Sequence, residues 1–125
     1  MSQSDQPTFG NGKVCYLEMP SVDIESSANF YQKVFGWNVR TRGDGATSFD
    51  DGVFQVSGVW TTEKKPMEGG ILIYIMVADM EKTKALIESN GGSILDHDLT
   101  RGGEQISRFK DADGNVMGLY EQKGI

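Results

Sequence analysis

The sequence has few of the residues that hold metals or cross-link chains: one cysteine, Cys15, and one histidine, His97, among 125 residues. A single cysteine cannot close an internal disulfide, which suits a reducing compartment, and we expect a cytoplasmic protein. Basic residues are also scarce, with 12 Lys and Arg against 18 Asp and Glu and a formal net charge of −6. This charge repels phosphate backbones, so nucleic acid is not an expected partner.

Long hydrophobic runs are missing as well. The longest apolar stretch, residues 71–78, is much shorter than the roughly 20 residues that a membrane helix needs. Residues 1–13 lack the basic and apolar segments of a signal peptide, so no membrane is expected as a partner. The rest is ordinary for a globular chain, since 38% of residues are hydrophobic and 24% are charged, and the length suits one domain.

Two segments of the chain share one helical pattern. The first begins at Asp23 and ends at Gly36, and the second begins at Asp79 and ends at Gly91 and Gly92. Asp can accept bonds from the free N–H groups of a first helical turn, and Gly adopts the left-handed cap that ends a helix. The spacing of apolar residues predicts two amphipathic helices at a constant offset, since 79 − 23 = 56 and 92 − 36 = 56.

Strand-like runs surround both helices. One run precedes each helix, at 14–22 and 70–78. The runs that follow are 37–41, 46–49 and 53–60 in the first half, and 93–99, 104–110 and 115–121 in the second. Turn residues separate them, and the sequence QVSGVW of the first half matches NVMGLY of the second at an offset of 115 − 55 = 60.

Each half therefore predicts strand, helix, strand, strand, strand. The expected fold class is α+β, with two tandem βαβββ modules whose curled mixed sheets surround a cavity and whose helices lie on the outer face. The expected domain covers 13–121, with module one at 13–60, a linker at 61–69 and module two at 70–121. Residues 1–12 and 122–125 are expected to be tails.

Two motifs carry a family resemblance. The run FYQKVFGW (30–37) and the ending DADGNVMGLYE (111–121), in a tandem βαβββ chain, resemble the vicinal oxygen chelate superfamily over about 13–121. That superfamily holds glyoxalase I, extradiol dioxygenases, fosfomycin-modifying enzymes and bleomycin-sequestering proteins. The resemblance implies the fold and, by analogy, a homodimer, but it does not choose among activities.

The resemblance also implies where a metal would be held. In metal-using relatives each half supplies one ligand from its first strand, usually His, and one from its last strand, usually Glu. These positions fall on Tyr16 and Leu72, and on Gly58 and Gly118. Leucine and glycine have no donor atom for such metals, and one tyrosine is not enough, so we expect no metal and no cofactor.

Three nearby residues are the alternatives for a metal. Glu18 and Gln55 would approach the ligand positions if the alignment were displaced by a residue or two, but without histidine they would form a poor site. His97 lies between Asp96 and Asp98, and a solvated histidine is the favoured interpretation because strand neighbours point to opposite faces.

Strand alternation predicts the lining of the cavity, if Tyr16 faces it. The predicted ligand-binding residues are Tyr16, Glu18, Val56, Gly58, Trp60, Leu72, Tyr74, Met76, Gly118 and Tyr120. Aromatic side chains with polar tips suit planar or cationic ligands, a buried carboxylate suits an amine, and glycines leave room for a guest. The alternative is that these rings fill the space themselves and that Glu18 lies at an exposed strand end.

Other residues are expected to be structural. Phe30, Tyr31 and Val34 should attach the first helix to the sheet, and Cys15 should be buried and inert on the helix side. Arg108 is a candidate anion partner at the cavity mouth, although a solvated arginine is the favoured interpretation.

We therefore expect a metal-free protein that binds a small aromatic or amine-bearing molecule. The alternative is a lyase, isomerase or dioxygenase that uses a metal or an acid–base pair of Glu18 with Tyr16 or Tyr74. A third possibility is a structural or regulatory dimer module whose cavity is vestigial. No residue is predicted to be catalytic, and whether the chain is an enzyme stays open.

Overall fold

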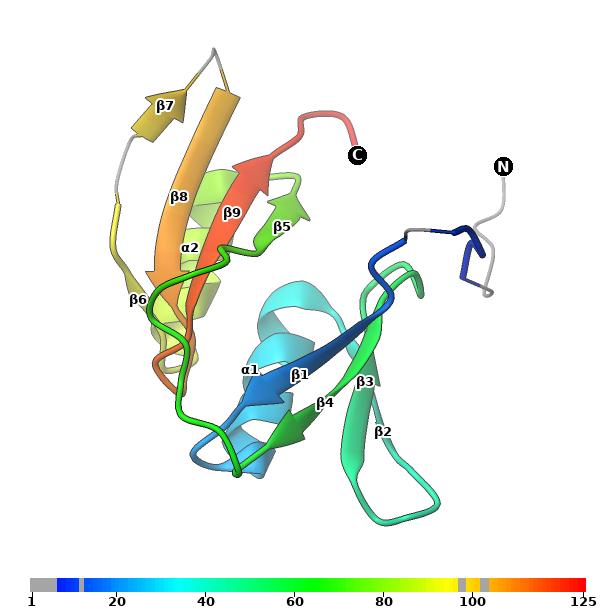
Figure 1. The fold of residues 1–125 in the computed structure, drawn as a ribbon. Coiled ribbons are helices and arrows are strands. Elements are labelled where there is room, and N and C mark those ends of the chain that lie inside the picture. Colours follow the sequence, from blue (N-terminus) through cyan, green and yellow to red (C-terminus); the bar gives the residue numbers. More distant parts are fainter. Residues whose placement is uncertain (1–6, 12, 97–98, 102–103) are drawn as a thin grey trace. The chain divides into compact units, whose positions relative to one another are not determined.

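A computed structural model describes residues 7–11, 13–96, 99–101 and 104–125 (Figure 1). The chain divides into two compact units, residues 1–65 and 66–125, which are described separately. The α+β class and the two tandem modules predicted from the sequence are confirmed, because each unit combines one helix with one mixed sheet.

The first unit contains one helix and one sheet. Its elements are β1 (Tyr16–Pro20), α1 (Ile24–Phe35), β2 (Asn38–Thr41), β3 (Thr47–Asp50) and β4 (Ser57–Thr61). The strand order is β1-β4-β3-β2, with β1 parallel to β4 and the other neighbours antiparallel. Helix α1 packs against this sheet and leaves the other face open (Figure 1).

The second unit repeats this plan with one additional short strand. Its elements are β5 (Tyr74–Val77), α2 (Met80–Ser89), β6 (Ser93–Ile94), β7 (Leu99–Arg101), β8 (Glu104–Lys110) and β9 (Val116–Glu121). The order is β5-β9-β8-β6, and β7 pairs with β8. Strands β5 and β9 are parallel, and α2 packs on β6 and β9 (Figure 1).

Both helices begin as the sequence predicts. The carboxylate of Asp23 accepts a hydrogen bond from the N–H of Glu25, and that of Asp79 accepts one from the N–H of Lys82. Helix α1 ends at Gly36, whose φ of 69° is the left-handed cap that glycine adopts without strain. None of the helices formed by the described residues is long and apolar enough to cross a membrane.

The core of the first unit consists of stacked aromatic rings under α1. Trp37 lies between Tyr31 and Phe49, with ring centroids at 4.4 and 4.6 Å, and Phe49 lies 4.8 Å from Trp60. Phe30 and Tyr31 of the helix are fully buried. The FYQKVFGW run therefore attaches α1 to the sheet, which is the structural role that the sequence predicts.

The corresponding core of the second unit is mostly aliphatic. Ile87 of α2 is fully buried, as are Phe109 of β8 and Met117 and Leu119 of β9. The stacked rings of Tyr31, Trp37 and Phe49 belong to the first unit. The two repeats therefore bury their helices against cores of different chemistry.

The turns that precede the last strands differ in length by one residue. In the first unit the N–H of Asp51 donates to the carbonyl of Val56, five positions later along the chain. In the second unit the N–H of Asp111 donates to the carbonyl of Asn115, only four positions later. The first turn therefore holds one more residue, and this shifts the alignment of everything that follows it.

This difference corrects the predicted match of QVSGVW with NVMGLY. Glu18 and Tyr74 each lie five residues before a capping Asp, and they pair with Val59 and Gly118 respectively. The last strands are therefore offset by 118 − 59 = 59 residues, and the predicted offset of 60 is wrong for them. A register change of one residue turns every side chain of a strand to the other face.

Candidate functional site

The open face of the second unit brings together four of the predicted ligand-binding residues. Tyr74 pairs with Gly118, and Met76 pairs with Tyr120, so the four form two adjacent rows. Their neighbours Ile75 and Leu119 point the other way, toward the core, because side chains alternate along a strand. Tyr74 is 45% exposed and Met76 is 56% exposed, so both are accessible within this unit.

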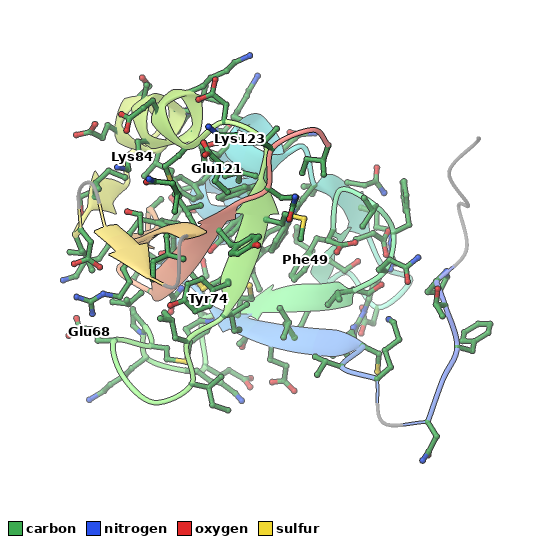
Figure 2. All side chains as sticks on the ribbon, turned by 90° about the horizontal axis from the view of Figure 1, so that it is seen from above. Phe49, Glu68, Tyr74, Lys84, Glu121 and Lys123 are labelled. Atoms are coloured by element: carbon green, nitrogen blue, oxygen red, sulfur yellow. The ribbon has the colours of Figure 1, made fainter. Side chains whose placement is uncertain are left out.

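Gly118 makes room for a side chain of the protein. A Cβ atom at this position would lie 2.6 to 3.0 Å from three carbons of the Tyr74 ring, so the ring lies directly against the glycine backbone. The sequence-based expectation assigned this space to a guest molecule. The glycine instead lets the tyrosine lie across β9, with part of its ring surface exposed (Figure 2).

A small pocket lies at one end of the same unit. Its volume is about 170 Å³, and its lining consists of Glu68, Gly69, Gly70, Ile71, Leu72, Arg108 and Val116. Leu72 is thus the predicted ligand-binding residue that lines it. At the rim, Glu68 approaches the ammonium group of Lys110 at 3.9 Å, and this pair is exposed to solvent.

Arg108 is held in place by a two-point ion pair. Its Nε donates to Oδ2 of Asp96 at 2.7 Å, and its Nη2 donates to Oδ1 at 3.2 Å. These hydrogen bonds raise the pKa of Arg108 above its ordinary value. The guanidinium is half exposed, so it is solvated as the sequence suggests, but it is fixed in orientation.

The open face of the first unit carries Tyr16 and Glu18, which pair with Ser57 and Val59. The hydroxyl of Tyr16 accepts a hydrogen bond from Nη1 of Arg42 at 2.8 Å. Glu18 is exposed, and its carboxylate lies 3.4 Å from the ammonium of Lys64. The expectation of a buried carboxylate is therefore wrong within this unit, and the exposed alternative is the one observed.

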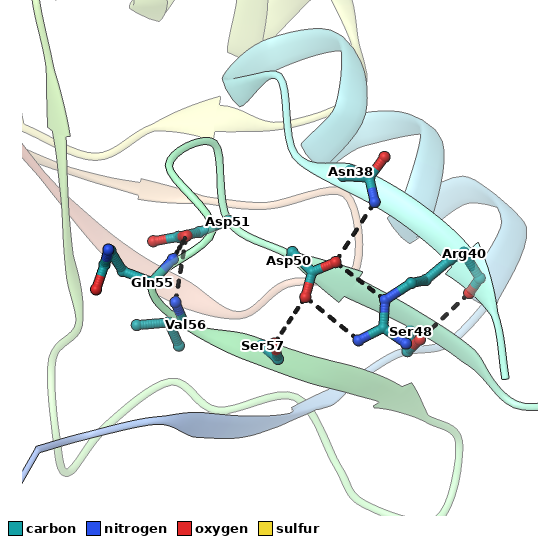
Figure 3. Close-up of polar contacts among 8 residues, drawn as sticks. All are labelled: Asn38, Arg40, Ser48, Asp50, Asp51, Gln55, Val56 and Ser57. Atoms are coloured by element: carbon teal, nitrogen blue, oxygen red, sulfur yellow. Dashed lines mark hydrogen bonds and ion pairs between the residues drawn. The ribbon is translucent and has the colours of Figure 1, made fainter. Parts of the chain in front are cut away.

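A polar network, which the sequence analysis did not identify, occupies the rest of this face (Figure 3). Asp50 accepts from Nε and Nη2 of Arg40 at 3.0 and 3.2 Å, from Ser57 Oγ at 2.7 Å and from Asn38 Nδ2 at 3.4 Å. The hydrogen bond from Arg40 is the main cause that lowers the pKa of Asp50. Arg40 and Asp50 are diagonal neighbours across β2 and β3, because Asn38 pairs with Asp50 and Arg40 pairs with Ser48.

Gly58 and Trp60 point toward the core, contrary to the prediction. Trp60 is 2% exposed and its ring lies 6.1 Å from Tyr31 of α1. A Cβ atom on Gly58 would lie 2.3 Å from the Phe49 ring and 2.4 Å from the carbonyl oxygen of Leu17. The longer turn before β4 is the reason, because its extra residue reverses the predicted parity.

Val56 lies in that longer turn, before β4 begins. Its N–H donates to the carboxylate of Asp51 at 3.2 Å, and its side chain is half buried. Its predicted place on the open face of a strand is therefore wrong, because the residue closes the turn instead of continuing the strand.

Cys15 and His97 complete the set of predicted residues. Cys15 is exposed, not buried, because β1 begins only at the following residue. His97 lies outside the described residues. Among the residues that the structure describes, no group of three His, Cys, Asp or Glu side chains is arranged to hold a metal ion.

A comparison of the sequence with family models decides the family. The model of the Glyoxalase/Bleomycin resistance protein/Dioxygenase superfamily matches residues 13–119. The chain belongs to this superfamily. A glyoxylase-like domain-containing protein from Didymella fabae is a similar relative, 26% identical over 125 residues that cover 91% of this chain and 97% of the relative.

Solved structures of the superfamily share the fold. A member from Sphaerobacter thermophilus has a TM-score of 0.72 at 17% identity and covers 89% of this chain and 98% of its own. The fosfomycin resistance protein FosX from Listeria monocytogenes has a TM-score of 0.69 at 13% identity, with coverages of 90% and 93%. An antibiotic binding protein from a Streptomyces species has a TM-score of 0.68 at 20% identity, with coverages of 93% and 100%.

Proposed function

We propose that this chain is a binding protein of the superfamily that holds a small aromatic molecule without a metal. The observation that carries the proposal is the exposed aromatic surface of the second unit. The Tyr74 ring rests on Gly118, with Met76 and Tyr120 in the next row. Fixed aromatic rings bind planar molecules by stacking, and a thioether adapts to irregular shapes beside them.

The metal-free part of the proposal rests on the residues at the positions implied by the resemblance. Tyr16 stands on β1, Leu72 lies two residues before β5, and Gly118 stands on β9. The register makes Val59 the counterpart of Gly118, in place of Gly58. Val59 has no donor atom either, so the corrected alignment supports the same proposal.

The ligand chemistry is narrowed by the surroundings of Glu18. Glu18 is exposed, and its carboxylate already lies 3.4 Å from the ammonium of Lys64. Exposed ion pairs of this kind contribute little energy, so an amine-bearing ligand would gain little by replacing Lys64. We therefore base the proposal on the aromatic ligand. Tyr16 and Glu18 stay predicted ligand-binding residues.

Names of structurally similar proteins agree with a binding role. One is called an antibiotic binding protein, and another a fosfomycin resistance protein. Because their identities to this chain are 20% and 13%, they share its fold, and the role of each is a property of that protein alone.

The test is titration calorimetry with 2-naphthalenemethanol, a neutral planar probe. Tyr74→Ala should weaken its binding about tenfold, because aromatic stacking contributes about 0.5–1.5 kcal/mol in addition to the buried area. Phe9→Ala is the matched control, since Phe9 is an exposed aromatic residue of the first unit. Equal binding by the two variants would contradict the proposal.

Elemental analysis of protein purified without added metal separates this proposal from the enzymatic alternative. Stoichiometric nickel, iron, manganese or zinc would favour the alternative of a metal-dependent lyase, isomerase or dioxygenase. A preparation without stoichiometric metal that still binds the probe would support the binding protein.

A further inference from the structure

Arg108 and Tyr74 occupy opposite ends of one row across the second sheet. Both pair with Gly118, Arg108 from β8 and Tyr74 from β5. Since neighbouring strands lie about 4.8 Å apart, the two backbones are about 10 Å apart. Gly118 has no side chain, so the row places an aromatic ring and a guanidinium side by side across a glycine.

The guanidinium keeps unused hydrogen-bond donors. Arginine has five N–H groups, and Asp96 accepts from one on Nε and one on Nη2. Two donors on Nη1 and one on Nη2 remain, and among the described residues no acceptor for them is found. Two of these donors, one on each Nη, lie along the terminal edge of the planar group, where their spacing matches the two oxygens of a carboxylate.

The pocket beside Arg108 has room for such a group. Its volume of about 170 Å³ exceeds the ~30 Å³ that one water occupies in the liquid. Its rim includes Gly69 and Gly70, which add no side chains.

The charges around the pocket cancel. Asp96 faces Arg108 at 2.7 Å, and Glu68 faces Lys110 at 3.9 Å, so each cation has an anionic neighbour. The pocket therefore has no excess of one sign that would attract every anion. Recognition there depends on directed hydrogen bonds, for which the planar fork of arginine is better suited than lysine.

We infer that the aromatic ligand of the second unit carries a carboxylate, which binds the free edge of Arg108 while its ring stacks on Tyr74. Asp96 is a positioning residue, because it orients the guanidinium without contacting the ligand. This inference rests on the proposed function and specifies its ligand class. It replaces the amine predicted from Glu18 with an acid.

The experiment compares two probes with the same ring, 2-naphthoate and 2-naphthalenemethanol, by titration calorimetry. We expect naphthoate to bind the unaltered chain at least tenfold more tightly, since hydrogen bonds to charged groups are the stronger class. Arg108→Gln should abolish this preference, because it weakens the binding of naphthoate more than that of the alcohol. Arg40→Gln is the matched control, because Arg40 forms the same two-point pair with Asp50 in the first unit, and this variant should keep the preference.

The outcomes separate the inference from the proposed function. If both probes bind equally, or if the preference survives Arg108→Gln, the carboxylate inference is wrong and aromatic binding stands. If Arg108→Lys keeps the full preference, charge alone is sufficient and the role of the fork is overturned. If neither probe binds to the unaltered chain, and its thermal melt shows that it is folded, the proposed function fails and the inference fails with it.

Discussion

In the first unit a stack of aromatic rings lies beneath the helix and the exposed Tyr16 accepts a hydrogen bond from Arg42, whereas in the second unit Tyr74 and Tyr120 lie on the open face. Phe49 and Trp60 belong to the buried stack of the first unit, and its open face carries the network around Asp50 (Figure 3). The second unit buries mostly aliphatic side chains, with Phe109 among them, and exposes Tyr74. The same βαβββ plan thus supports two different divisions between core and surface, and the second unit is the better candidate for ligand binding.

Gly58 and Gly118, the glycines of the two last strands, differ in the same way. Gly58 faces the core, where the Phe49 ring covers it, and Gly118 faces outward, where the Tyr74 ring covers it. In both places a ring lies on a backbone without a side chain. One arrangement stabilises the core, and the other holds an exposed ring in a defined position.

The largest expected effect distinguishes the two cores. Phe49→Ala should reduce the free energy of unfolding by about 4–5 kcal/mol, because it removes a buried ring between two tryptophans. Phe109→Ala, at the corresponding buried position of β8, should cost less, about 3–4 kcal/mol. Urea unfolding measures both. Equal losses in the free energy of unfolding would show that ring stacking contributes nothing beyond the burial of apolar area.

Substitution of the two glycines should sharpen the comparison. Gly58→Ala should cost about 2–3 kcal/mol, because the new Cβ would lie 2.4 Å from a backbone oxygen that cannot move alone. Gly118→Ala should cost less than about 1 kcal/mol, because the half-exposed Tyr74 ring can swing away. It should weaken naphthalene binding at the same time. Thermal melts measure the two stabilities, and calorimetry measures the binding. The prediction is wrong if Gly118→Ala is the more destabilising variant.

The open face of the first unit should respond to pH. Asp50 has a lowered pKa in the folded protein, so it stabilises the fold above its unfolded pKa of about 3.9 and loses this effect as pH falls through the folded value. Asp50→Asn should therefore cost up to about 1 kcal/mol near pH 6 and almost nothing near pH 2. Urea unfolding across this range is the measurement. Arg40→Gln should weaken the dependence of the free energy of unfolding on pH. If that dependence is unchanged in the variant, the ion pair of Arg40 with Asp50 is not its cause.

The smallest expected effect concerns the turns before the last strands. Phe54 adopts a φ of 58°, whereas Gly114 occupies the corresponding turn of the second unit with a φ of 98°. Phe54→Gly should stabilise the chain by up to about 1 kcal/mol, because only glycine takes positive φ without strain. Gly114→Ala should destabilise it. A loss of stability in Phe54→Gly would mean that the contacts of the ring outweigh the strain.

Local rules predicted the repeated framework. Asp23 and Asp79 cap their helices and Gly36 ends α1, because capping depends on residues within one turn. The parity of β1 and β5 followed in the same way, since both strands lead directly into a helix whose start is marked. On these strands Tyr16 and Tyr74 are 46% and 45% exposed, so both face away from the core.

The faces of Gly58 and Trp60 were not predictable by these rules. The face on which each side chain lies depends on the number of residues in the preceding turn. In that turn Phe54 has a positive φ, which no residue type in the sequence indicates. The pairing of Asp96 with Arg108 likewise joins residues 12 positions apart, across strands whose register the sequence leaves open.

The sequence by itself determined the tandem repeat, the two capped helices and the family, because these depend on short-range spacing and on motifs. Only the tertiary structure decided which glycine faces the core, which tyrosine lies exposed on its neighbour and which arginine keeps free donors. The physical reason is that a strand alternates its faces at every residue. A single additional residue in a turn therefore reverses a whole lining while the local pattern stays the same.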